Sequence, residues 1–110
     1  MTLSDLYSQT LAVLNNARNV MLSADFQASL NDPNDRLAAS HALGDVQRAI
    51  LMLANTALAD IVDQMQANEA GLTTATQALG DALKHIDNVK NLITNITGVI
   101  NVVAKIVPLL

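Results

Sequence analysis

Few residues in this sequence have the type and spacing that catalysis or metal binding requires. His41 and Asp45 stand four residues apart, so on a helix they share a face and offer half of a metal site. His85 and Asp87 are two residues apart and do not share a helical face. Ser40, next to His41, has no third group in a recognisable triad arrangement. Isolated pairs of this kind are typical of solvated helix surfaces, so we predict no metal site and no hydrolase chemistry.

The acidic residues Asp60 and Asp63 form a further candidate pair. Their spacing puts both on one face of a predicted helix, where paired carboxylates serve acid–base chemistry or bind a magnesium-bound phosphate. Such spacings are also frequent on ordinary polar helix faces. Glu69 is the only glutamate, so the Glu-x-x-His pairs of di-iron bundles are absent, and no glycine-rich phosphate loop occurs. We therefore predict a non-enzymatic protein with no catalytic residue, no metal and no cofactor.

The composition is that of a helical protein. Of 110 residues, 51% are hydrophobic, and Tyr7 and Phe26 are the only aromatic side chains. A core of small and branched aliphatic residues suits close packing between helices. Four glycines and two prolines interrupt the chain, and no cysteine is present, which excludes disulfides and thiolate metal sites. The length predicts a single domain over residues 1–110.

The charge pattern bears on partners and on location. The net charge is −4, and six Lys and Arg residues are scattered over the chain, which argues against nucleic acid as a partner. The first five residues lack the positive region and the apolar run of a signal peptide. We therefore expect a cytoplasmic protein by default, with a leaderless secretion route left open.

Two breaks divide the sequence into three predicted helices. At the first break, Asp32 can cap a helix and Pro33 suits its first position. At the second, Gly71 can end a helix in the left-handed conformation, and a capping box starts at Thr74. Thr2 and Asp5 offer a similar cap at the start of the chain. The predicted helices span residues 3–29, 33–70 and 75–107.

This pattern predicts an all-α protein, an antiparallel bundle of three helices in which the second and third form a long hairpin. A four-helix variant stays open, because a glycine could split one of the long helices. The glycines at issue are Gly44, Gly80 and Gly98. The predicted second helix carries an apolar row made of Leu51, Ala54, Leu58, Ile61 and Met65, and a neighbouring strip adds Leu43, Val46, Ile50, Leu53 and Ala57.

The predicted third helix carries the clearest pattern. Apolar residues recur every seven positions from Leu79 to Val107, and a second row three residues later runs from Ala82 to Val103. These are the a and d positions of helices that pack lengthwise against other helices. The first row contains Leu79, Ile86, Ile93, Ile100 and Val107.

The segment 91–110 has an apolar arc wider than the stripe of roughly 100° that a surface helix needs. Three interpretations of the excess stay open: a helix central to its own core, an oligomer interface, and an amphipathic membrane element. A membrane span is disfavoured, because Asn95, Asn101 and Lys105 would be costly in lipid. The candidate interface residues are Leu92, Ile93, Ile96, Val99, Ile100, Val103 and Ile106.

These observations lead to one expected function and one alternative. We expect a helical interaction or structural protein that self-associates, or binds another helical protein, through its apolar C-terminal helix. The alternative is a membrane-active protein in which residues 91–110 lie against lipid. No feature of the sequence selects a small-molecule ligand, and no motif identifies a known family.

Overall fold

The computed structural model describes residues 2–86 and 88–108. Within these residues the chain forms six α-helices, one short 3-10 helix and no strand, which confirms the all-α prediction. The elements are α1 (Leu3–Met21), α2 (Ala24–Ala28), α3 (Pro33–Ala54), η1 (Leu58–Asp60), α4 (Val62–Ala67), α5 (Glu69–Lys84) and α6 (Val89–Val103).

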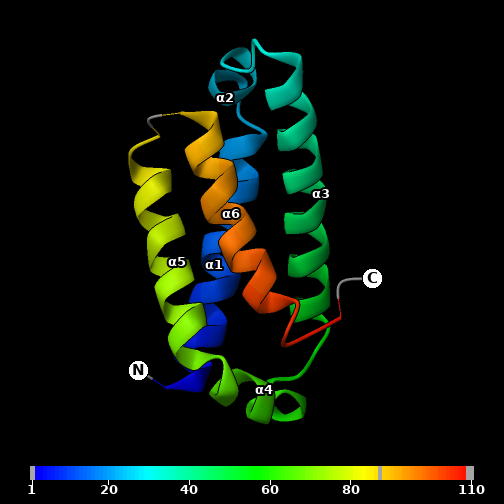
Figure 1. Cartoon of the computed structure of the whole chain (residues 1–110). Helices are drawn as coiled ribbons and strands as arrows, with labels where there is room; N and C mark the ends of the chain where they lie inside the picture. The colour runs from blue at the N-terminus through cyan, green and yellow to red at the C-terminus, as the bar shows by residue number, and fades with distance from the viewer. Residues whose placement is uncertain (1, 87, 109–110) are drawn as a thin grey trace.

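The four long helices, α1, α3, α5 and α6, run alternately up and down and form a bundle (Figure 1). Both α1 and α6 pack against α3 and α5, so the helices occupy four corners in the order α1, α3, α6, α5. The connection between α3 and α5 therefore crosses to the diagonally opposite corner, through η1 and α4 beneath the bundle. The short helix α2 lies at the other end, between α1 and α3 in the chain.

The two predicted helix starts at the N-terminal side of the chain are confirmed. The Thr2 hydroxyl accepts a hydrogen bond from the Asp5 amide at 3.0 Å, and the Asp5 carboxylate accepts one from the Thr2 amide at 3.3 Å. At the next start, the Asp32 carboxylate accepts a hydrogen bond from the Asn34 amide at 2.8 Å, with Pro33 in the first turn. Caps of this kind satisfy amide groups that the first turn of a helix leaves without partners.

The predicted helix over residues 33–70 is too long, because α3 ends at Ala54. Side chains take over the hydrogen bonding there: the Thr56 hydroxyl donates to the Met52 carbonyl at 2.7 Å. The Tyr7 hydroxyl, from α1, lies 3.0 Å from the Thr56 carbonyl oxygen. The last carbonyls of a helix need such partners when the backbone turns away. Neither glycine nor proline marks this end, so the local sequence did not reveal it.

The predicted turn at Gly71 is wrong. This residue lies inside α5, which starts at Glu69, and its φ is not positive. The capping box predicted at Thr74 is likewise absorbed into the helix, and α5 runs on without interruption to Lys84.

The predicted helix over residues 75–107 divides at the link between α5 and α6. The Asn88 side-chain oxygen accepts a hydrogen bond from the Asn91 amide at 2.7 Å and so caps the start of α6. Ile86, which the heptad pattern placed against another helix, lies in this link and is 42% exposed. The structure thus has four long helices, and one division lies at Ile86 rather than at a glycine. The predicted hairpin of the second and third helices is wrong, because α3 and α5 lie at diagonally opposite corners and α5 pairs with α6 instead.

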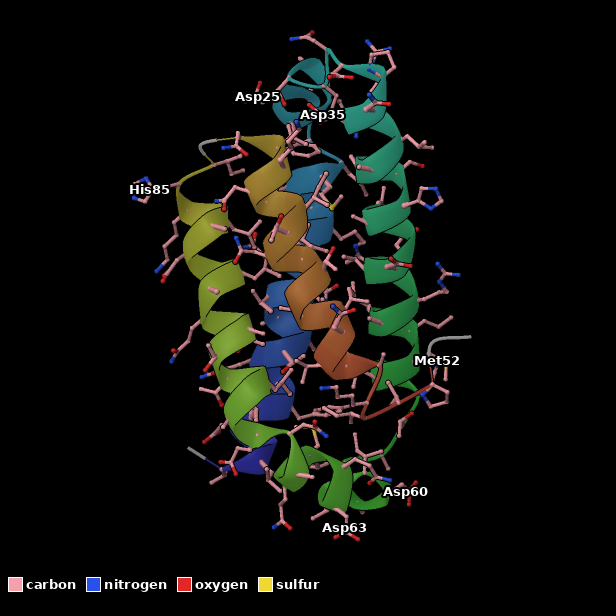
Figure 2. All side chains as sticks on the ribbon, viewed as in Figure 1. Asp25, Asp35, Met52, Asp60, Asp63 and His85 are labelled. Carbon is pink, nitrogen blue, oxygen red and sulfur yellow. The ribbon has the colours of Figure 1, made fainter. Side chains whose placement is uncertain are left out.

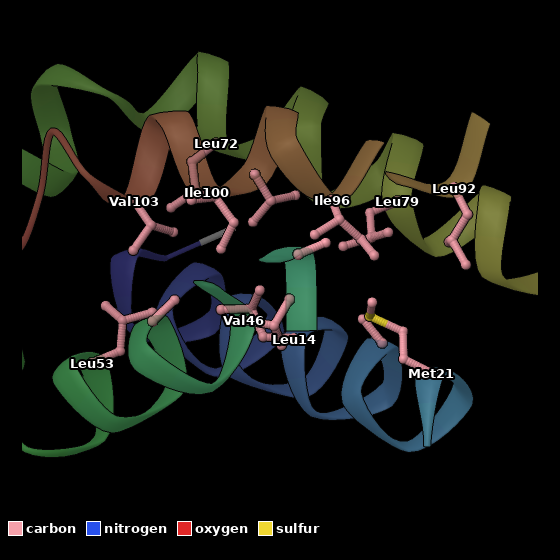
Figure 3. Close-up of a cluster of buried hydrophobic side chains, with 14 of the residues drawn as sticks. Leu14, Met21, Val46, Leu53, Leu72, Leu79, Leu92, Ile96, Ile100 and Val103 are labelled. Carbon is pink, nitrogen blue, oxygen red and sulfur yellow. The ribbon is translucent and has the colours of Figure 1, made fainter. Parts of the chain in front are cut away.

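The core fills the space among the four long helices (Figure 3). Each long helix contributes a fully covered side chain at mid-height, namely Leu14, Val46, Leu79 and Ile96. Two threonines are also buried, and each donates its hydroxyl to a carbonyl one turn back in its own helix, so neither hydroxyl lacks a partner.

Candidate interaction surface

The predicted interface residues lie mainly inside the bundle. Six of the seven are buried against the chain's own helices: Leu92, Ile96, Val99, Ile100, Val103 and Ile106. The seventh, Ile93, is partly buried at the edge of the core. The wide apolar arc of α6 has a physical cause, since this helix packs against both α3 and α5. Contact between these residues and a partner stays a prediction, and it would require the bundle to open.

The histidine and aspartate pairs do not converge on a site. The Asp45 carboxylate accepts a hydrogen bond from the Arg48 guanidinium at 2.8 Å, whereas His41 is exposed. In the parts of the chain that the structure describes, no group of three or more histidine, aspartate or glutamate residues could hold a metal ion. His85 points away from the bundle at the end of α5 (Figure 2), and Asp87 lies outside the described residues.

The predicted shared helical face of Asp60 and Asp63 is wrong. Asp60 ends η1, Asp63 lies in α4, and between them Ile61 turns inward and is buried. Both aspartates are exposed at the end of the bundle where the chain crosses between corners (Figure 2). The arrangement is that of a solvated connection.

A small cavity lies under α2, between the ends of α1 and α3. Its volume is about 240 Å³, and its lining combines apolar Met21, Phe26, Leu30, Ala39 and Leu43 with polar Gln27, Arg36 and Ser40. Arg36 donates from Nε to the Leu30 carbonyl at 2.7 Å, and Gln27 donates to the Met21 carbonyl at 2.6 Å, so both hold the chain around α2. Ligand pockets usually measure roughly 300–1,000 Å³, so this cavity is small for a binding site.

Two exposed leucines lie on the side of α3 that faces away from the bundle, one near each end of the helix. Leu37 is 61% exposed and Leu51 is 59% exposed, more than the other exposed large hydrophobic residues, Leu22 and Ile86. Leu37 and Leu51 are separated by 14 residues, which is about four helical turns, so they lie on the same side of α3. We call this surface the outer α3 face; it consists of Leu37, Ser40, His41, Gly44, Gln47, Arg48 and Leu51.

Sequence reasoning missed the outer α3 face, because it assigned Leu51 to a row that packs on other helices. The core side of α3 is a different row, made of Ala39, Ala42, Val46, Ala49 and Leu53. Its three alanines have short side chains, so α3 can lie close to α1 and α6. The predicted neighbouring strip contained Val46 and Leu53, which are buried, but it did not include the three alanines that complete the core side.

Comparison with known proteins finds no family model, no curated protein and no solved structure that matches this chain. The outer α3 face is therefore the surface feature from which a function can be inferred.

Proposed function

We propose that this chain is a non-enzymatic helical interaction protein that self-associates through the outer α3 face. The observation that supports the proposal is the exposure of Leu37 and Leu51 on one side of one helix, opposite its core side. Full burial of a leucine side chain stabilises a protein by about 1.5–3 kcal/mol. Leu37 and Leu51 gain little of this free energy within one chain, because both are mostly exposed. Contact with another helix would bury them and supply the remainder. A different helical protein is the alternative partner.

The free energy gained by burying the leucines limits how tightly two copies can bind. A symmetric contact buries two leucines from each copy, worth roughly 1 kcal/mol each at their remaining exposure. Association itself costs about 4–15 kcal/mol in lost freedom of motion. The leucines offset at most part of this cost, so we expect a complex no tighter than roughly millimolar.

Light scattering after size exclusion, without detergent and over a wide range of concentration, tests the proposal. We expect the mass to rise towards that of a dimer with concentration. The double variant Leu37→Lys/Leu51→Lys should stay monomeric, because it places charge where the apolar contact forms. Its free energy of unfolding should change by less than about 0.5 kcal/mol per site, since both residues are exposed.

Leu22→Lys is the matched control, because Leu22 is 54% exposed but follows α1 and is not part of α3. This variant should associate like the unmodified chain. A monomer at every concentration, or a double variant that still associates, would count against self-association through α3.

A second candidate function is membrane activity through α6, and one observation favours it. Of the 15 residues of α6, five are buried and three more pack at the edge of the core. Release of this helix from the bundle would therefore expose a wide apolar side, which suits binding in the plane of a membrane surface. Within the described residues, no helix is both long enough and apolar enough to cross a bilayer.

A further inference from the structure

We infer that the second copy binds antiparallel to the first along α3, with the two-fold axis passing beside Gly44. The inference rests on the self-association proposed above and specifies its geometry. The outer α3 face is its own complement when the helix is reversed about this glycine, and three features of the face lead to that conclusion.

The first feature is the placement of the two leucines. Leu37 and Leu51 each lie seven residues from Gly44, which is roughly 10.5 Å along the helix axis in each direction. Reversal about Gly44 therefore brings Leu37 of one copy opposite Leu51 of the second, and the other leucine pair forms at the same time. Both exposed leucines of each chain are covered in one isologous contact.

The second feature is the absence of a side chain at Gly44, in the centre of the outer α3 face. Among the described residues, and apart from the adjacent backbone of α3, a Cβ atom at Gly44 would meet only the Arg48 guanidinium, at 3.9 Å. At a two-fold axis a residue meets its own copy, so the absence of a side chain lets the two backbones approach. Helices in contact lie about 8–10 Å apart, and the short end of this range requires small residues at the crossing point.

The third feature is the match of the polar residues. Reversal about Gly44 puts Ser40 opposite Arg48 and His41 opposite Gln47, and none of these pairs brings like charges together. The Arg48 charge is already balanced by Asp45 at 2.8 Å. In a parallel arrangement each residue would lie opposite itself, and two Arg48 guanidinium groups would then repel each other. The antiparallel orientation avoids this contact, although the neighbouring Asp45 carboxylate weakens the repulsion that it avoids.

Disulfide formation between single-cysteine variants tests the orientation, because the chain has no cysteine of its own. Ser40→Cys and Arg48→Cys both replace exposed residues. Under mild oxidation, a mixture of the two should give a disulfide-linked heterodimer, identified by its mass, and each variant alone should remain largely unlinked. A disulfide forms only between residues whose Cα atoms lie about 4.4–6.8 Å apart, so the product reports the register directly.

Homodimers from each variant alone would overturn the antiparallel arrangement in favour of a parallel one. A chain that dimerises by light scattering but gives no mixed disulfide would overturn the register, and the proposed self-association would stand. A chain that is monomeric at every concentration would overturn both.

A second pair of variants tests the position of the axis. Gly44→Lys should weaken self-association at least tenfold, because it places two ammonium groups against each other at the axis. Gly80→Lys, in α5, is the matched control: in the part of the chain that the structure describes, nothing beyond the adjacent backbone of α5 lies within 4 Å of the added Cβ, and the variant should associate like the unmodified chain. Equal association of both variants would overturn the placement at Gly44, and urea unfolding confirms that each remains folded.

Discussion

Tyr7 joins two elements that lie far apart in the sequence. Its hydroxyl is within hydrogen-bonding reach of the carbonyl oxygens of Leu53 and Thr56, so a side chain from α1 serves the last turn of α3. The last carbonyls of a helix have no backbone partner within the helix. The phenol therefore contributes to the end of α3 at Ala54, which no local residue marks.

The variant Tyr7→Phe tests this role. It removes the hydroxyl and keeps the ring, so the free energy of unfolding should fall by about 1 kcal/mol, the usual net contribution of one hydrogen bond. Urea unfolding followed by circular dichroism measures the change. An unfolding midpoint equal to that of the unmodified chain would show that the hydroxyl does not stabilise this end of α3.

At the scale of elements, the sequence pattern and the structure assign different backbone conformations to Gly71. The sequence pattern predicts a left-handed glycine that ends a helix, whereas the structure places this residue in the first turn of α5 with no positive φ. The two descriptions differ in what an added methyl group would do. In a left-handed conformation a side chain is strained, and inside a helix alanine is favoured over glycine.

Gly71→Ala should therefore stabilise the protein by about 0.5–1 kcal/mol, because alanine loses less conformational freedom on folding. The new Cβ would lie 4.0 Å from Val102 Cγ2, an ordinary contact. Gly80→Ala, where nothing lies within 4 Å, should give a similar gain and serves as the control. Thermal and urea unfolding measure both variants. A loss of stability at Gly71 alone would contradict the helical conformation there.

At the link between α5 and α6, the heptad pattern of apolar residues continues although the helix does not. The heptad positions at Leu79, Ile96 and Val103 are buried as predicted, while Ile86 is exposed. The spacing of apolar residues indicates which side of a helix packs. It does not show that a single row of such residues is divided between two antiparallel helices. That depends on Asn88, which caps α6, and on the packing of α6 against α3.

At the scale of the whole molecule, the bundle decides what α6 can do. In the folded chain its apolar side packs on α3 and α5, so contact with lipid requires α6 to leave the bundle. Release would cost the burial of five aliphatic side chains, on the order of 10 kcal/mol in total. A membrane would have to replace this burial with contact of the same apolar kind.

Flotation with phosphatidylcholine vesicles tests membrane activity. If α6 is released onto lipid, binding should persist in high salt, because an apolar contact is not screened. The double variant Leu37→Lys/Leu51→Lys keeps α6 intact, so it should bind vesicles to the same extent. Loss of binding in this variant would assign the contact to the outer α3 face, and no flotation of either chain would contradict membrane activity.

The sequence by itself determined the helical class and the local starts of helices. Apolar spacing and the scarcity of glycine and proline indicated helices, and Thr2 and Asp32 located two of their starts, because a cap depends only on residues within a few positions. It also showed that the C-terminal segment has a wide apolar side.

Only the tertiary structure decided where α3 and α5 end, which side of α3 packs inward, and that the apolar side of α6 is covered by its own chain. The end of α3 involves Tyr7, 46 residues away from Leu53 in the chain. The inward side of α3 follows from how closely its alanines let neighbouring helices approach, which leaves Leu37 and Leu51 outside. Such choices depend on the shapes of several helices at once, and no local pattern contains that information.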